Sequence, residues 1–216
     1  AGGTALLHAA IFGALMALAV GANMLIAYRM RPLFRPSTPE QNGLDRYRDV
    51  VQPVRTWLMA GTSVLIGVFA GASASGQWRN FLMWRNGGSF GTDDPYFGRD
   101  IGFYVFDLPW LHFMIDFVMA VAIVALLASA AVHYLFGGIR LQVPHDRLSP
   151  AAQAQFSVLL GIFVLAKAGG LYDRAVWDWS AALLRAARIT VRVEGPGVLS
   201  DRPVVYVANH ISVLDI

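Results

Sequence analysis

The sequence predicts an all-α polytopic membrane helix bundle, with three to four transmembrane helices and a short, truncated α/β segment at its C-terminal end. Of its 216 residues, 56% are hydrophobic and 14% are charged, whereas a soluble domain carries about a quarter charged residues. The apolar residues form runs long enough to cross about 30 Å of hydrocarbon at about 1.5 Å per residue. We therefore expect a transmembrane bundle over residues 1–172 and a separate segment over 173–216.

Four apolar segments are the expected spans. They cover about residues 4–28, 57–77, 110–136 and 151–172. The fourth is the weakest, because Gln153, Gln155 and Lys167 dilute its apolar centre. Whether it crosses the membrane fully is left open, since a re-entrant segment would have a similar composition.

The arginines of the connecting loops predict the orientation of the bundle. The loops 29–56 and 137–150 together hold eight arginines, whereas the loop 79–109 holds three. Because arginine is enriched in cytoplasmic loops, we expect 29–56 and 137–150 to be cytoplasmic and 79–109 to be extracytoplasmic. This explanation of the net charge of +3 excludes a nucleic-acid partner and leaves the lipid bilayer as the expected one.

The first loop contains a predicted helix. Thr38 is a suitable N-cap, Pro39 suits the first helical position, and Gln41 is placed to close a capping box. In the second loop, Asn86-Gly87-Gly88 and Asp94-Pro95 are predicted turns.

Two charged residues lie inside the predicted spans. Asp116 and Lys167 are each five or six residues from the outer end of a span, so antiparallel neighbours would bring them to about the same depth, roughly 8–9 Å. An intramembrane charge pair is a functional candidate, and a purely structural pair is the competing interpretation. His112 shares a helix face with Asp116, but two ligands do not make a site. We predict no metal and no cofactor.

Small residues recur on one face of the second span. Gly67, Gly71 and Ser75 are each four residues apart, and Gly67 and Gly71 form a GxxxG motif. Such a stripe is typical of close helix packing in membranes, and the lining of a substrate path is the alternative.

Several separated motifs resemble uncharacterised protein family 0182, multi-pass membrane proteins of actinobacteria. They include Phe34-Arg35-Pro36-Ser37-Thr38-Pro39-Glu40-Gln41, Gly71-Ala72-Ser73-Ala74-Ser75-Gly76-Gln77-Trp78-Arg79 and Phe103-Tyr104-Val105-Phe106-Asp107-Leu108-Pro109. The resemblance covers about residues 1–170 and implies a bacterial plasma-membrane protein with further spans, of which this chain would be a fragment. The family has no established activity, so the resemblance implies no reaction.

The C-terminal segment resembles the start of a glycerolipid acyltransferase domain, from about residue 176 to 216. The motif is Asn209-His210-Ile211-Ser212-Val213-Leu214-Asp215 after the short apolar strand 204–208. The resemblance implies His210 as the general base and Asp215 as the residue that orients it, with an acyl thioester donor and a lysophospholipid acceptor. The later motifs of that family are missing, so we expect this chain alone to be inactive.

The sequence therefore supports three functional hypotheses. The leading one is an integral membrane fragment of an uncharacterised family, with a structural role and no assignable reaction. The alternatives are a truncated, membrane-tethered phospholipid-synthesis acyltransferase and a transporter or channel component. A four-span count places the C-terminal tail outside, but its five arginines favour the cytoplasm, as a join of unrelated sequences near residues 170–178 would produce.

Overall fold

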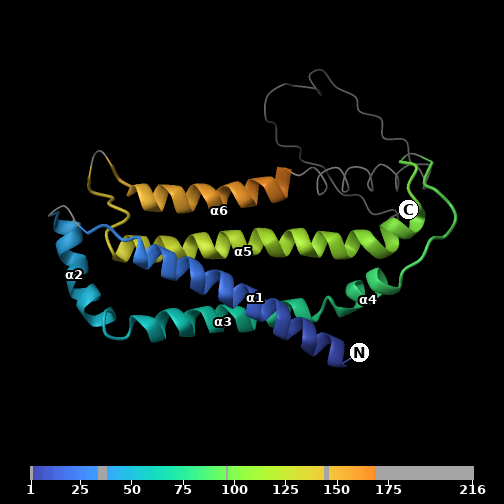
Figure 1. Ribbon diagram of the computed structural model, residues 1–216, viewed down its shortest axis with the longest axis horizontal. Helices are drawn as coiled ribbons and strands as arrows, with labels where there is room; N and C mark the ends of the chain where they lie inside the picture. The colour runs from blue at the N-terminus through green and yellow to red at the C-terminus, as the bar shows by residue number, and fades with distance from the viewer. Residues whose placement is uncertain (1, 34–37, 96, 144–145, 169–216) are drawn as a thin grey trace, which may run out of the picture. The chain divides into compact units, whose positions relative to one another are not determined.

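The computed structural model describes residues 2–33, 38–95, 97–143 and 146–168, and most of them are helical (Figure 1). The helices are α1 (Gly2–Arg29), α2 (Pro39–Val51), α3 (Arg55–Ser75), α4 (Trp78–Asn86), the short π-helix η1 (Phe103–Asp107), α5 (Leu108–Leu135) and α6 (Pro150–Ala168). These residues form no sheet, and their β-pairing is limited to isolated bridges such as Asp93 with Asp100. The predicted helix bundle is confirmed, and the predicted α/β segment lies outside the described residues.

Four helical stretches are long and apolar enough to cross a membrane. They are Gly2–Arg29, Arg55–Ser75, Phe103–Leu135 and Pro150–Lys167. Many of their large side chains face outward, including Leu6 at 73%, Phe69 at 69% and Leu165 at 73% exposure. Such surfaces would be unfavourable in water, and they suit contact with lipid.

The structure differs from the sequence prediction in the second loop. The segment 79–109 is not a continuous loop, because α4 continues to Asn86 and η1 begins at Phe103. The third span therefore begins at Phe103 rather than near Trp110. Apolar residues preceding Asp107 extend the helix, and Pro109 occupies an early helical position, where its missing N–H needs no partner.

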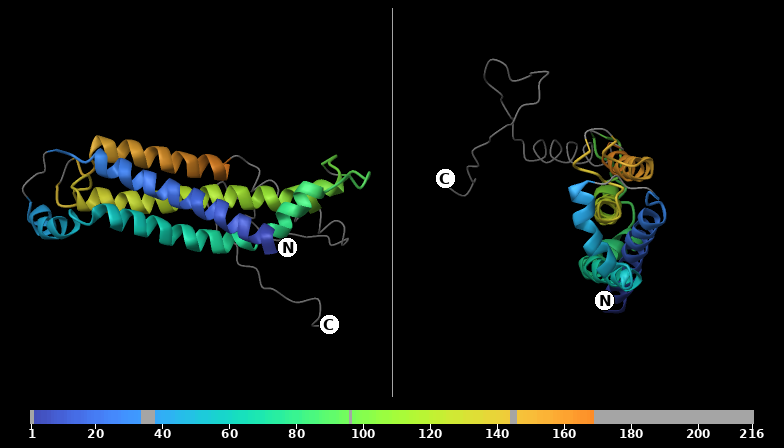
Figure 2. Two further views of the ribbon diagram at one scale, coloured as in Figure 1. Left: turned by 60° about the horizontal axis from the view of Figure 1, so that its bottom comes forward. Right: turned by 90° about the vertical axis from the view of Figure 1, so that its left-hand side faces the viewer.

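Helix α1 crosses α3 at very short range (Figure 2). A Cβ atom at Gly67 would lie 2.6 Å from the Gly13 carbonyl oxygen and 2.8 Å from Ala17 Cβ. A Cβ atom at Gly71 would likewise collide with the Ala9 carbonyl oxygen. Only glycine allows the two backbones to approach this closely, so the predicted packing role of Gly67 and Gly71 is confirmed.

Two apolar clusters fill the space between α1 and α5. The first contains the buried Met16, Val20 and Met24 of α1 and Val132 of α5. The second, near the start of α1, is aromatic: Phe12 and Trp110 pack edge-to-face at 6.0 Å between ring centroids. Helix α6 packs against α5 on its other side (Figure 1).

The α1–α3 contact gives the first prediction. Replacing Gly67 with Ala should lower the free energy of unfolding by about 1–3 kcal/mol, because the added methyl group overpacks the interface. The matched control is Gly61→Ala on the same helix, where a Cβ atom would meet nothing within 4 Å. That control should be neutral or stabilising by up to about 1 kcal/mol, since alanine favours helix more than glycine. Thermal unfolding in detergent measures both, and equal effects would contradict the assigned contact.

Candidate functional site

A chain of buried hydrogen bonds joins three of the spans. His133 of α5 is 1% exposed, and its Nε2 lies 3.0 Å from Oε1 of Gln155 on α6. The Gln155 amide nitrogen donates to both the backbone oxygen and Oδ1 of Asn23 on α1, each at 3.0 Å. We call His133, Gln155 and Asn23 the polar clamp, because they tie α1, α5 and α6 together.

The geometry of the polar clamp assigns the tautomer of its histidine. Gln155 uses its amide nitrogen toward Asn23, so its Oε1 is the acceptor and His133 Nε2 carries the hydrogen. His133 Nδ1 is buried and has no hydrogen-bond partner among the described residues. A Cβ atom at Gly138 would lie 2.5 Å from this Nδ1, so glycine is needed there. Of the three clamp side chains, only the imidazole can change its charge.

Sequence reasoning missed the polar clamp. It noted Gln155 only as a residue that weakens the fourth span, and Asn23 only as an interruption of the first. The available signal was an amide side chain inside each of two apolar segments, since such groups commonly bond between helices. Their partners could not be identified without the packing of α1, α5 and α6.

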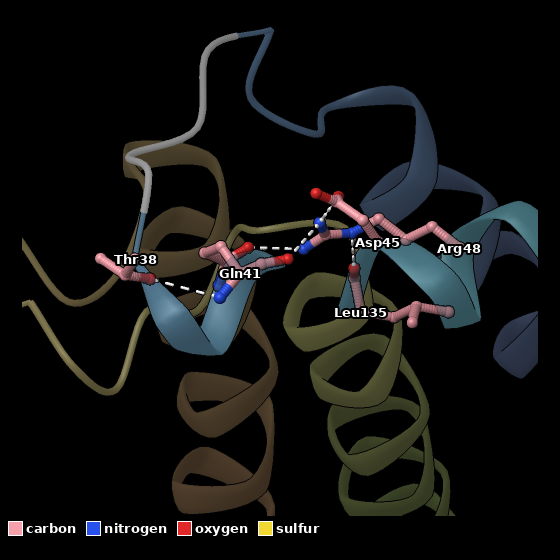
Figure 3. Close-up of polar contacts among 5 residues, drawn as sticks. All are labelled: Thr38, Gln41, Asp45, Arg48 and Leu135. Carbon is pink, nitrogen blue, oxygen red and sulfur yellow. Dashed lines mark hydrogen bonds and ion pairs between the residues drawn. The ribbon is translucent and has the colours of Figure 1, made fainter. Parts of the chain in front are cut away.

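A second polar centre attaches α2 to the end of α5 (Figure 3). Arg48 is 5% exposed, and its guanidinium donates to the carbonyl oxygen of Leu135 and to Asp45. It also donates to the backbone oxygen and to the side-chain oxygen of Gln41. The ion pair and these bonds compensate the burial of the guanidinium charge.

The cap of α2 is as predicted in one half and different in the other. Thr38 Oγ1 accepts from the Gln41 backbone N–H at 3.2 Å (Figure 3). The Gln41 side chain does not close a capping box, because its oxygen accepts from Arg48 instead. Glu40 at the same end accepts from the backbone N–H of Gln142 at 3.0 Å. The two loops predicted to be cytoplasmic are therefore in direct contact.

The loop between α4 and η1 is organised around Asp100. Its carboxylate accepts from the Ser89 hydroxyl and from the backbone N–H groups of Phe90, Gly91 and Gly102. The Ser89 hydrogen bond first, and then the backbone N–H groups, lower the pKa of Asp100 from 3.8 to about 2. With its oxygens taken by these donors, Asp100 is poorly placed to bind a cation. The described residues contain no group of three or more potential metal ligands.

The predicted charge pair lies on two helices that pack together. Asp116 is in α5 and Lys167 is in the last turn of α6, and both side chains are exposed. Within the described residues, no ion pair joins them, so their pairing stays a prediction. His210 and Asp215 lie outside the described residues.

The comparisons with known proteins decide the family. The model of the Uncharacterised protein family (UPF0182) matches residues 3–176. The chain belongs to this family. Similar proteins include a UPF0182 protein of Nocardioides sp., which is 67% identical over 158 residues, and one of Streptomyces coelicolor, which is 51% identical over 158 residues. No solved structure matches the chain.

The alignments cover only part of these relatives. Each covers 73% of this chain and 16% of the relative. The relatives carry only the family name, so no reaction is assignable to this UPF0182 chain. The family match ends before His210 and Asp215, and the acyltransferase resemblance gains no support from these comparisons. The acyl thioester and lysophospholipid partners rest on the sequence motif alone.

Acid should loosen the loop that Asp100 organises. Because the folded pKa lies below the ordinary value of 3.8, the carboxylate stabilises the folded loop above about pH 4, and this contribution is lost as the pH falls toward 2. Pepsin cleavage between residues 89 and 102 should therefore accelerate over this range. Asp100→Asn should give fast cleavage throughout, whereas the control Asp94→Asn should keep the acid-dependent step. An unchanged rate in Asp100→Asn would refute the role of this carboxylate.

Proposed function

We propose that residues 2–168 serve as a membrane-embedded structural scaffold within a longer UPF0182 protein. The observation that carries this proposal is the polar clamp, which connects α1, α5 and α6 through buried side chains. Its amides bind one another and the backbone, which suits a fixed structure better than a reacting site. A catalytic centre would need a nucleophile or a carboxylate beside the imidazole, and the clamp has neither.

Two further contacts support the scaffold proposal. The glycine contact holds α3 against α1, so every described span is joined to α1 directly or through α5. Arg48 and Glu40 hold α2 to the α5–α6 end of the bundle. Each connection is short and specific, as expected for a bundle that positions other parts of a large membrane protein.

We also propose an orientation and a boundary for this scaffold. The arginine distribution favours loops 29–56 and 137–150 in the cytoplasm and 79–109 outside the plasma membrane. The contact of α2 with the α5–α6 loop supports a common side for the first two. The end of the family match at residue 176 supports a division between 1–172 and 173–216.

A transport role is the second candidate, favoured by Asp116 and Lys167. Both are exposed on apolar helices, and a charge exposed to hydrocarbon is costly. Such residues commonly mark ion or substrate paths in membrane proteins. The scaffold proposal stands first, because the described contacts of the chain are all accounted for by packing.

The scaffold proposal predicts that Gln155 is needed for stability. Gln155→Leu should lower the free energy of unfolding by about 1–3 kcal/mol, because it leaves His133 Nε2 and the Asn23 acceptors buried without partners. Gln153→Leu is the matched control, since Gln153 is exposed on the same helix, and it should change stability little. Thermal unfolding in detergent compares them. Equal stability of the two variants would remove the clamp as the basis of the proposal.

The orientation is testable by cysteine labelling, because the chain has no cysteine. Thr92→Cys should react with a membrane-impermeant maleimide in intact cells. Asn42→Cys should react only after the membrane is permeabilised. Both positions are exposed, so burial does not limit either reaction. The opposite pattern would invert the proposed orientation.

A further inference from the structure

An apolar groove runs between α1 and α3. Its volume is about 500 Å³, and its floor is built from small residues that include Ala17, Gly21, Ala60 and Ser63. A Cβ atom at Gly21 would lie 3.1 Å from Ser63 Oγ, so the helices remain close beneath the groove. Its rims carry Leu18 and Val64, which are 71% and 60% exposed. The groove is therefore open on its outer side.

The length of the groove corresponds to one leaflet. Its lining on α1 extends from Ala17, near the middle of the helix, to Arg29, at the end. Twelve residues of α-helix rise about 18 Å, and half of the hydrocarbon thickness is about 15 Å. A chain lying in the groove would thus reach from the membrane centre to its surface.

The surface end of the groove is cationic. Arg29 and Arg55 line it together with Tyr28 and Thr56. The Arg55 guanidinium lies 5.1 Å from the centroid of the Tyr28 ring, and Arg31 covers the same ring at 4.2 Å. In the part of the chain that the structure describes, neither Arg29 nor Arg55 forms an ion pair with a carboxylate. Two positive charges at this end thus lack an anionic partner.

From this combination we propose that the groove binds an anionic phospholipid. One acyl chain lies along Ala17, Gly21 and Ala60, and the headgroup phosphate is held by Arg29 and Arg55. The Thr56 hydroxyl is a further donor at the headgroup. An apolar helix from another part of a longer chain could fill the groove, but it would leave the two arginines without an anion. A phospholipid satisfies both the apolar groove and its charged end.

The test measures lipid binding to the full chain in detergent by native mass spectrometry. Phosphatidylglycerol should bind at least about tenfold more tightly than zwitterionic phosphatidylcholine, because each arginine near the headgroup contributes about fivefold. The double variant Arg29→Ala/Arg55→Ala should lose this preference and keep the binding of phosphatidylcholine. Ala60→Phe should weaken both lipids, because the phenyl group occupies the groove.

Matched variants control for unspecific effects. Arg79→Ala/Arg85→Ala removes two exposed arginines beyond the opposite end of α3, and Ala72→Phe adds a phenyl group to an exposed position of α3 outside the groove. Both should bind phosphatidylglycerol as the unmodified chain does. Ala60 is exposed, so Ala60→Phe should fold normally even if loss of the Arg55–Tyr28 contact destabilises the arginine variant.

Three outcomes would overturn the proposal. Equal binding of the two lipids would show that the arginines do not recognise the headgroup. Displacement of phosphatidylglycerol by equimolar glycerol phosphate would show an anion site without a contribution from the acyl chain. Unchanged binding in Ala60→Phe would place the lipid elsewhere, as expected if a protein segment occupies the groove.

Discussion

The backbone contact between α1 and α3 is the constraint on which the rest of the bundle depends. In lipid the hydrophobic effect does not drive helices together, so they associate through close packing and hydrogen bonds. Gly13, Gly67 and Gly71 remove the side chains that would keep these two helices apart. With α1 held in this way, Asn23 faces Gln155, and the small residues beyond Gly67 form the floor of the open groove.

The buried polar groups of the bundle are satisfied in two different ways. Arg48 lies at the end of the spans and is surrounded by carbonyl and carboxylate oxygens, so its charge is fully compensated. The polar clamp lies within the spans and uses amides, which cost less to bury than charges. Its imidazole still has one buried nitrogen without a described partner. The clamp therefore stabilises the fold mainly by linking helices, and this is why a structural role explains it best.

The parts of the candidate site that the sequence predicted are those governed by local rules. Thr38 was recognised because an N-cap depends on its neighbours in sequence, and Gly67 with Gly71 because small residues recur once per helical turn. Gln155 was missed because its partners are 22 and 132 residues away. Asp116 and Lys167 attracted attention because charges are rare in spans, yet the described structure does not join them.

By itself, the sequence determined the family, the helical class and the approximate position of each span, because length and apolar composition are sufficient for a helix to cross a bilayer. Tertiary structure alone decided which faces of these helices meet. The π-turn before α5, the exchange of the Gln41 capping role for a contact with Arg48, and the polar clamp all depend on neighbours distant in sequence. The groove also required the structure, since it exists only where two helices leave apolar surface uncovered beside unpaired positive charge.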